Sequence, residues 1–304
     1  MSIAMAGRND SGLVLPGVLL AGLVALICLQ TGLIRLPQGG VTLQGPETVT
    51  IASRSFSYRA SGEFLQGTAS IDAPLVRVDH HATLEIMKYQ VSAADFAQCV
   101  AEGACEKARP RWNAVGDVPA TGVSYEDAVD YAIWLGDRTG ETWRLPTVEE
   151  WVFAAGSRAV DTAVGVAVNE ANPAERWLLA YRKEAALSLD GTAAPQAPGT
   201  FGTNEFGVAD LSAVVWEWTS TCASRTTLNA SGNIVAYTQN CGARYLEGRH
   251  RAAMSTFIRD GVSGGCSIGV PPDNLGLRLV RDTNWAQRIV SWVAAIWRQS
   301  SAEL

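Results

Sequence analysis

A long apolar run near the N-terminus limits what the first residues of this chain can form. Residues 12–34 read "GLVLPGVLLAGLVALICLQTGLI", and Gln30 and Thr31 are the only polar side chains among them. About 20 residues of α-helix, rising about 1.5 Å each, cross the hydrocarbon core of a bilayer. The run therefore predicts a transmembrane signal anchor at residues 12–34 after a short N-terminal tail at residues 1–11.

A cleaved signal peptide is the alternative. The run is longer than the usual apolar region of such a peptide, and no A-x-A-like cleavage site follows it. Ile27 precedes Cys28, where a lipoprotein signal would have a small residue. We therefore expect a retained single-pass anchor in the inner membrane, with the soluble domain in the periplasm.

Charge and composition indicate what kind of domain follows the apolar run. The formal net charge is −6, which argues against nucleic acid as a partner because phosphate backbones are bound by excess positive charge. The chain contains 10 tryptophans and 29 glycines, a composition that favours a loop-rich domain with an aromatic core over a helical bundle.

The cysteines are consistent with export. Five follow the apolar run: Cys99, Cys105, Cys222, Cys241 and Cys266. They can form two bridges in several ways, and the sequence alone does not select one. A Cys99–Cys105 bridge would close a short loop, and a Cys222–Cys241 bridge would bracket a hairpin with its turn at residues 231–233, leaving Cys266 over. Reduced thiols in a cytosolic protein are the alternative, but a membrane anchor favours the disulfides.

Three helix starts are marked by capping signals. In each, Ser or Thr is followed three residues later by an acidic residue: Ser92 with Asp95, Ser124 with Asp127, and Thr147 with Glu150. The first side chain can accept a hydrogen bond from the third helical amide while the acidic side chain reaches back. In "WRLPTVEEW", Pro146 ends the extended piece that precedes the third helix.

The order of elements indicates an α+β domain. Residues 35–70 alternate apolar and polar side chains among Gly, Pro and Ser, which indicates a linker and first strands. The capped helices follow, and after residue 200 short strands are separated by Gly and Asn turns. Helices grouped before strands are typical of the α+β class.

Three segments in order resemble one family. "VSYEDAVDYAIWLGDRTGETWRLPTVEEWVFAA" at 123–155, "NEFGVADLSAVVWEWTS" at 204–220 and "NLGLRLVRD" at 274–282 resemble its V-S-W-x-D-A…R-L-P-T-E-A-E-W, G-N-V-W-E-W and N-x-G-F-R-x-V motifs. The family is the formylglycine-generating enzyme, or sulfatase-modifying factor, superfamily. The resemblance implies a C-type-lectin-like domain over residues 71–282.

The copper chemistry of that family is not implied here. The resembled oxidases hold copper(I) with a C-x4-C pair after an R-G-G-S-W-like strand, because soft thiolates suit Cu(I). Aligned forward from Gly248, the cysteine positions become Ala253 and Ile258; aligned backward from "NLGLR", they become His250 and Ser255. We therefore expect copper-type formylglycine formation to be absent.

Two other metal sites are weakened. The G-N that helps hold calcium in the resembled family reads Ala213-Val214, so calcium remains only as a weak alternative through Asp210 and Glu217. An iron site built on histidine is disfavoured as well. The chain contains three histidines, His80, His81 and His250, and neighbouring strand residues point to opposite faces.

A polar segment remains as the candidate ligand site. "RYLEGRHR" at 244–251 and the following residues supply four arginines, namely Arg244, Arg249, Arg251 and Arg259, which could present guanidinium groups to a carboxylate, phosphate or peptide. The catalytic candidates there are Glu247, His250 and Asp260. The alternative is that Glu247 pairs with these arginines and only holds irregular strands together.

The C-terminal residues 283–304 form a separate element. "NWAQRIVSWVAAIWRQ" places tryptophan and aliphatic residues on one helical face. This amphipathic helix is expected to pack on its own domain, lie in the membrane interface, or dock on a partner protein.

The resemblance implies an accessory or binding module as the first hypothesis. Relatives without the cysteine pair include the accessory protein encoded beside copper nitrite reductase, and "EGRHR" followed by "PPDNLGLR" resembles that group. The second hypothesis is a periplasmic tailoring enzyme, like the homologue in pyoverdine maturation, that uses Glu247 or Asp260. The third and weakest hypothesis is a formylglycine-generating oxidase.

Overall fold

The computed structural model describes residues 44–112, 115–165, 173–186, 194–261 and 274–283. The predicted anchor, the C-terminal helix, Cys28 and Cys266 lie outside these residues. Within the described ranges, no helix combines the length and apolar character needed to cross a bilayer. All described residues belong to one compact unit, which begins at Leu43.

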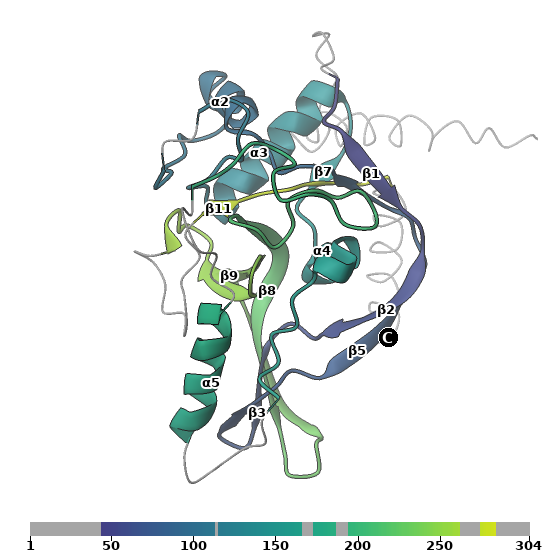
Figure 1. Cartoon of the computed structure of the whole chain (residues 1–304), viewed down its shortest axis with the longest axis vertical. Helices are drawn as coiled ribbons and strands as arrows, with labels where there is room; N and C mark the ends of the chain where they lie inside the picture. Colours follow the sequence, from purple (N-terminus) through teal and green to yellow (C-terminus); the bar gives the residue numbers. More distant parts are fainter. Residues whose placement is uncertain (1–43, 113–114, 166–172, 187–193, 262–273, 284–304) are drawn as a thin grey trace, which may run out of the picture. The chain divides into compact units, whose positions relative to one another are not determined.

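One antiparallel sheet joins the two ends of the domain. Its order is β1 (Thr48–Ile51), β6 (Leu84–Met87), β12 (Val280–Arg281) and β7 (Trp143–Arg144). Val280 pairs with Ile86 on one side and Arg144 on the other. The last described strand is therefore inserted between strands from the first half of the chain (Figure 1).

A second sheet carries the long hairpin. β8 (Trp216–Leu228) and β9 (Ile234–Glu247) pair antiparallel, with β10 (Ala252–Ser255) beyond β9. β3 (Glu63–Gln66) runs parallel to β8 and leads to β4 (Ala69–Ile71), and β11 (Leu275–Gly276) pairs with the start of β8. β2 (Arg54–Arg59) and β5 (Leu75–His80) form a separate ribbon. The strands at the start of the domain, β1, β2 and β3, thus each pair with a strand that comes later in the sequence.

The three capped helices form at the predicted places. They are α2 (Ala93–Ala101), α3 (Tyr125–Thr139) and α4 (Val148–Ala155), with Ser92, Ser124 and Thr147 as N-caps. A short 3-10 turn (Gly156–Arg158) follows α4. A further helix, α5 (Pro173–Ala186), has no counterpart in the sequence-based expectations.

The predicted disulfides and hairpin turn are confirmed. Cys99 is bonded to Cys105, and Cys222 to Cys241. The Asn229 side chain accepts hydrogen bonds from the amides of Ser231 (3.0 Å) and Asn233 (2.9 Å), which fixes the turn between β8 and β9. The core is aromatic, as the composition indicated, and its largest fully buried side chains include Trp151, Trp216, Trp218 and Phe153.

Candidate functional site

The turn between β9 and β10 comprises residues 248–251 and lies within the segment that the sequence resemblance aligned with the copper motif. Buried Glu247 and half-buried Arg251 form an ion pair across it. Arg251 Nη1 also donates to the carbonyl oxygens of Arg59 (3.0 Å) and Ala60 (3.2 Å), at the end of β2. Burial raises the pKa of Glu247, and the charge of Arg251 opposes that rise. The pair therefore fastens the turn to the first half of the domain.

Arg249 and His250 are packed on one tryptophan. The Arg249 guanidinium lies 4.7 Å from the Trp216 ring centre, and the His250 ring meets the same indole edge-on at 5.4 Å. Burial, reinforced by the charge of Arg249, lowers the pKa of His250 to about 4. His250 is consequently neutral at pH 7.

The other two candidate arginines serve different parts of the fold. Arg244 donates to the Ser220 carbonyl and lies over the Tyr125 ring at 4.8 Å. Arg259 Nη2 and Nε both lie 2.6 Å from the Asp127 carboxylate, which also caps α3. Although burial raises the pKa of Asp127, hydrogen bonds from Arg259 and Ser124 hold it below its usual value.

The arginine-rich segment is thus not gathered into one open site. The contacts of Arg244, Arg249, Arg251 and Arg259 are with the β8–β9 hairpin, Trp216, the end of β2 and α3, respectively. Asp260 is half-buried beside this segment. These contacts favour the interpretation in which the segment holds irregular strands together.

The positions aligned with the copper cysteines do not fit copper(I). Ala253 is exposed, and Ile258 packs against the core; in the other alignment, His250 is buried and Ser255 ends β10. Every cysteine among the described residues belongs to a disulfide. No thiolate pair is therefore available in this part of the chain.

The carboxylates of the two weak calcium candidates already accept hydrogen bonds from groups within the protein. Asp210 accepts hydrogen bonds from the amides of Gly199 (2.6 Å) and Phe201 (2.8 Å). Glu217 lies against the guanidinium of Arg278, at 2.9 and 3.0 Å. A carboxylate paired with a buried cation does not fit a calcium ligand.

The histidines do not converge on an iron site. His80 packs its ring against Phe153 at 4.4 Å, 3.8 Å from the Glu149 carboxylate, while His81 is exposed. The neighbouring histidines therefore differ in environment: His80 is the last residue of β5, and His81 follows the strand. In the described ranges, no cluster of three His, Cys, Asp or Glu side chains could hold a metal ion.

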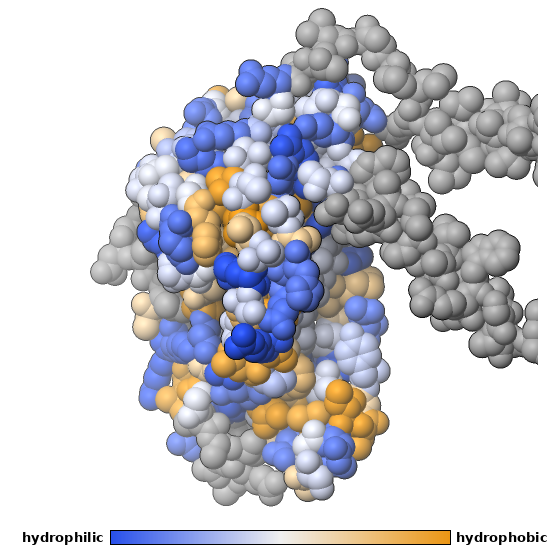
Figure 2. Space-filling model, turned by 90° about the vertical axis from the view of Figure 1, so that its right-hand side faces the viewer, coloured by the Kyte–Doolittle hydropathy of each residue, from blue (hydrophilic) through white to orange (hydrophobic). Residues whose placement is uncertain are grey.

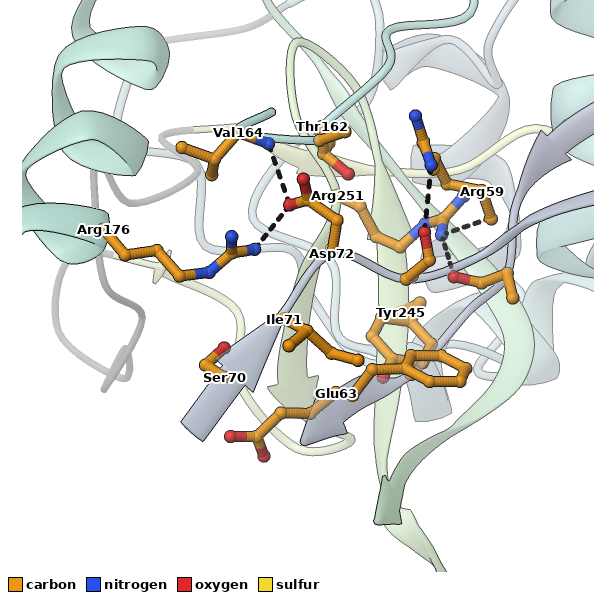
Figure 3. A pocket seen from close by; sticks show the side chains of 15 residues that line it. Arg59, Glu63, Ser70, Ile71, Asp72, Thr162, Val164, Arg176, Tyr245 and Arg251 are labelled. Carbon is orange, nitrogen blue, oxygen red and sulfur yellow. Dashed lines mark hydrogen bonds and ion pairs between the residues drawn. The ribbon is translucent and has the colours of Figure 1, made fainter. Parts of the chain in front are cut away.

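A polar cleft of about 330 Å³ opens beside the turn (Figure 3). Among its lining residues are Arg59 from β2, Asp72 after β4, Arg176 from α5, Tyr245 from β9 and Arg251. Asp72 accepts hydrogen bonds from the amides of Val164 (2.9 Å) and Gly165 (2.8 Å) and pairs with Arg176.

The charges in this cleft are already paired within the protein. Burial raises the pKa of Asp72, but the backbone amides and Arg176 lower it more strongly, so the net direction is down. Arg59 lies 3.0 Å from Asp161. Sequence reasoning missed the cleft because its ion pairs join residues about a hundred positions apart, and no motif marks them.

Comparison with known proteins assigns the class. The chain matches the sulfatase-modifying factor enzyme 1-like domain over residues 36–283. It therefore belongs to the FGE-sulfatase family and has the mixed α+β fold of that family.

Individual relatives are more distant. The formylglycine-generating enzyme of Mycobacterium tuberculosis is 38% identical over 110 residues, which are 34% of this chain and 33% of the relative. The chain thus matches about a third of the length of this curated relative. PvdO from Pseudomonas aeruginosa is 20% identical with a TM-score of 0.49, covering 78% of this chain and 94% of that one. Treponema denticola variable protein 1 is 15% identical with a TM-score of 0.43, at 78% and 99% coverage.

Proposed function

We propose that this protein is a membrane-anchored, exported accessory or binding module that keeps the FGE-sulfatase scaffold without its copper chemistry. The observation that supports the proposal most directly is which side chains occupy the β9–β10 region. Neither Ala253 and Ile258 nor His250 and Ser255 supplies a thiol there, and Glu247 is paired with Arg251 in the turn. A scaffold in which these side chains stabilise the fold suits binding better than oxygen activation.

The disulfides support the exported location. Structural disulfides persist in oxidising compartments such as the bacterial periplasm. Cys99–Cys105 and Cys222–Cys241 fit that compartment, and the apolar run at residues 12–34 would hold the domain at the membrane.

The partner we propose is a periplasmic redox enzyme whose maturation the module assists, with copper nitrite reductase as the first candidate. The test is co-expression of that reductase with and without the full-length chain, followed by measurement of bound copper and specific activity. A larger copper-loaded fraction with the chain present is expected. Equal copper content and equal activity would refute this assignment.

The oxidase alternative is separated by a direct titration. The full-length protein in detergent is titrated with copper(I) in competition with a chelator. Weak, non-stoichiometric binding is expected. Tight one-to-one binding together with oxidation of a cysteine peptide would instead support formylglycine formation.

One observation favours a second candidate function, a tailoring enzyme of non-copper mechanism. The pKa of buried Glu247 is raised, which is common among general acids and bases, and its partner Arg251 reaches the cleft. The test compares Glu247→Gln with wild type in periplasmic extracts by mass spectrometry. A product formed by wild type and absent with the variant, at unchanged thermal stability, would support this function; identical product profiles would exclude it.

A further inference from the structure

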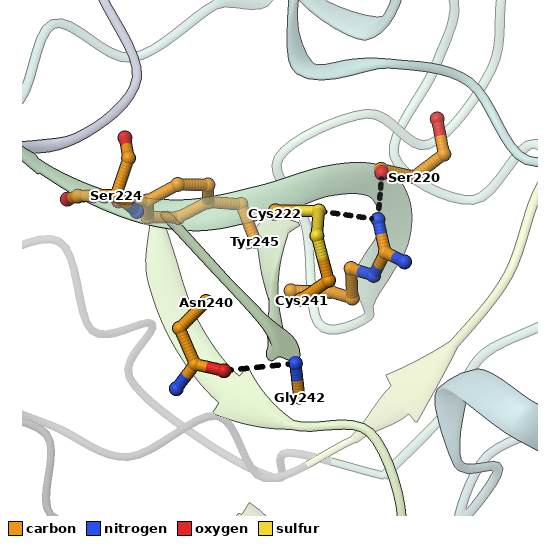
Figure 4. Close-up of a disulfide and its surroundings, with 8 residues drawn as sticks. Ser220, Cys222, Ser224, Asn240, Cys241, Gly242 and Tyr245 are labelled. Atoms are coloured by element: carbon orange, nitrogen blue, oxygen red, sulfur yellow. Dashed lines mark hydrogen bonds between the residues drawn. A yellow bond between two sulfur atoms is a disulfide. The ribbon is translucent and has the colours of Figure 1, made fainter. Parts of the chain in front are cut away.

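The Cys222–Cys241 bridge lies at an irregularity in the β8–β9 hairpin. Cys222 pairs in register with Arg244, whereas the next residue, Ala223, pairs with Asn240. Residues 241–243 therefore form a bulge with no partner on β8. The amide of Gly242 donates to the Asn240 side chain at 3.0 Å and closes the bulge on itself (Figure 4).

The two half-cystines of this bridge have different surroundings. Cys241 lies in the exposed bulge, whereas Cys222 is buried, with 8% of its surface exposed. Arg244 Nη1 lies 2.9 Å from the Cys222 sulfur. A positive donor is thus directed at the buried sulfur, and the other half-cystine faces solvent.

Arg244 is available to stabilise negative charge on that sulfur. Its remaining contacts are the Ser220 carbonyl and the face of Tyr125, and neither is a carboxylate. In the described part of the chain, no acidic side chain forms a salt bridge with it, and its buried Nε has no hydrogen-bond partner. A cation beside a sulfur lowers the pKa of the corresponding thiol.

We infer that Cys222–Cys241 is a reactive disulfide that exchanges with an incoming thiolate at Cys241. The thiolate attacks the Cys241 sulfur and forms a new S–S bond to it. The Cys222–Cys241 bond breaks, and its electron pair leaves on Cys222 as a thiolate beside Arg244. The number of S–S bonds is unchanged: the incoming sulfur is oxidised from the thiolate to the disulfide level, and the Cys222 sulfur is reduced from the disulfide to the thiolate level.

The substrate class is therefore a nucleophilic thiol, carried by a small molecule or by a protein cysteine. Exchange is faster when the leaving thiol has a lower pKa and the attacked sulfur is accessible. The direction of attack follows from the asymmetry, because Cys241 is exposed and Cys222 is the sulfur that contacts the guanidinium. This inference does not depend on the proposed accessory function.

The other disulfide provides an internal control. Cys99 and Cys105 are both buried, at 0% and 8% exposure, and both belong to the core cluster around α2 and α3. Neither offers an exposed half-cystine. We expect this bridge to remain oxidised under conditions that open Cys222–Cys241.

The experiment uses the full-length chain in detergent after free thiols have been blocked by alkylation. Reduced glutathione is added at neutral pH, new thiols are trapped with a second alkylating reagent, and peptides are mapped by mass spectrometry. The expected product carries glutathione on Cys241 and the second reagent on Cys222, with Cys99–Cys105 intact. Glutathione on Cys222, or opening of both bridges at one rate, would overturn the inference.

Variants test the role of Arg244. Arg244→Gln should slow adduct formation by roughly three- to tenfold, because the leaving thiolate loses its cation, while Arg244→Lys should restore most of the rate. Exchange at the wild-type rate in Arg244→Gln would contradict the inference. A parallel reaction with a thioredoxin-type protein that retains only its attacking cysteine shows whether a protein thiol reaches Cys241. Trapping of that protein on Cys241 identifies a protein thiol as a substrate; reaction with glutathione alone identifies small thiols.

Discussion

Arg278 and Glu217 form a salt bridge inside the domain, with 0% and 1% of their side chains exposed. Gln90 and Trp151 also donate to the Glu217 carboxylate, each at 2.7 Å. Arg278 also donates hydrogen bonds to the carbonyl oxygens of Met87, Lys88 and Ala209. One ion pair thus ties the segment after β11 to β8, to α4 and to the loop that follows β6.

Removing the cation of this pair should be strongly destabilising. In Arg278→Met the Glu217 carboxylate would stay buried without its cation, and breaking a buried pair from one side typically costs about 3–5 kcal/mol. The free energy of unfolding, measured by urea denaturation of the full-length chain, should fall by about that amount.

The matched control is an exposed pair. Arg225 and Glu63 lie 2.7 Å apart with 59% and 48% of their side chains exposed. Exposed pairs contribute about 1 kcal/mol or less, so Arg225→Met should change stability little. If both variants lowered the free energy of unfolding equally, burial of the Arg278–Glu217 pair would not explain the effect.

The cap of α4 should also contribute measurably. Thr147 Oγ1 accepts from the Glu150 amide at 3.1 Å, and the Glu150 carboxylate accepts from the Thr147 amide at 2.9 Å. Thr147→Ala removes half of this capping box and should lower the free energy of unfolding by about 1 kcal/mol. Thr147→Ser keeps the hydroxyl and should stay within a few tenths of wild type. A Ser variant as unstable as the Ala variant would argue against capping as the cause.

Local signals made these helix starts predictable. The caps at Ser92, Ser124 and Thr147, like the hairpin turn at residues 229–233, depend on side chains within four positions of one another. The "WRLPTVEEW" stretch combines such a cap with a family motif. The sequence therefore predicted both the local structure and the family.

The cleft and the ion pairs were not predictable in the same way. Arg176 meets Asp72 from 104 positions away, and Arg278 meets Glu217 from 61, so no spacing rule connects them. Helix α5 was missed because its large apolar residues are not core residues: Trp177, Leu178 and Tyr181 are each more than 40% exposed. The arginine-rich segment was recognised as polar, but only the fold shows that its arginines contact separate parts of the domain.

His250 should make stability depend on pH. Its pKa is about 4 in the folded protein and about 6.5 in an unfolded chain. The unfolded state therefore takes up the proton first as the pH falls. The contribution of neutral His250 is fully present above about pH 6.5 and is lost as the pH falls toward 4, by at most about 3 kcal/mol.

The measurement is the difference in unfolding free energy between pH 7.5 and pH 4.5. His250→Gln should reduce this difference because Gln does not titrate. His81→Gln, at an exposed position, should leave the wild-type difference intact. An unchanged difference in His250→Gln would assign the pH dependence to other groups.

Gly248 should tolerate no side chain. A Cβ there would lie 2.8 Å from two atoms of the Trp216 indole. That indole cannot easily move, since it is 1% exposed, donates to the His250 carbonyl at 3.1 Å and lies beneath Arg249. Gly248→Ala should therefore lower the free energy of unfolding by about 1–3 kcal/mol, because it overpacks a tight core.

Gly242→Ala is the control for this prediction. Its Cβ would meet only the end of the Asn240 side chain at 3.2 Å, so the variant should lower the free energy of unfolding by less than about 1 kcal/mol. Urea denaturation of both variants distinguishes a steric limit at Gly248 from a general cost of replacing glycine, which would lower both equally.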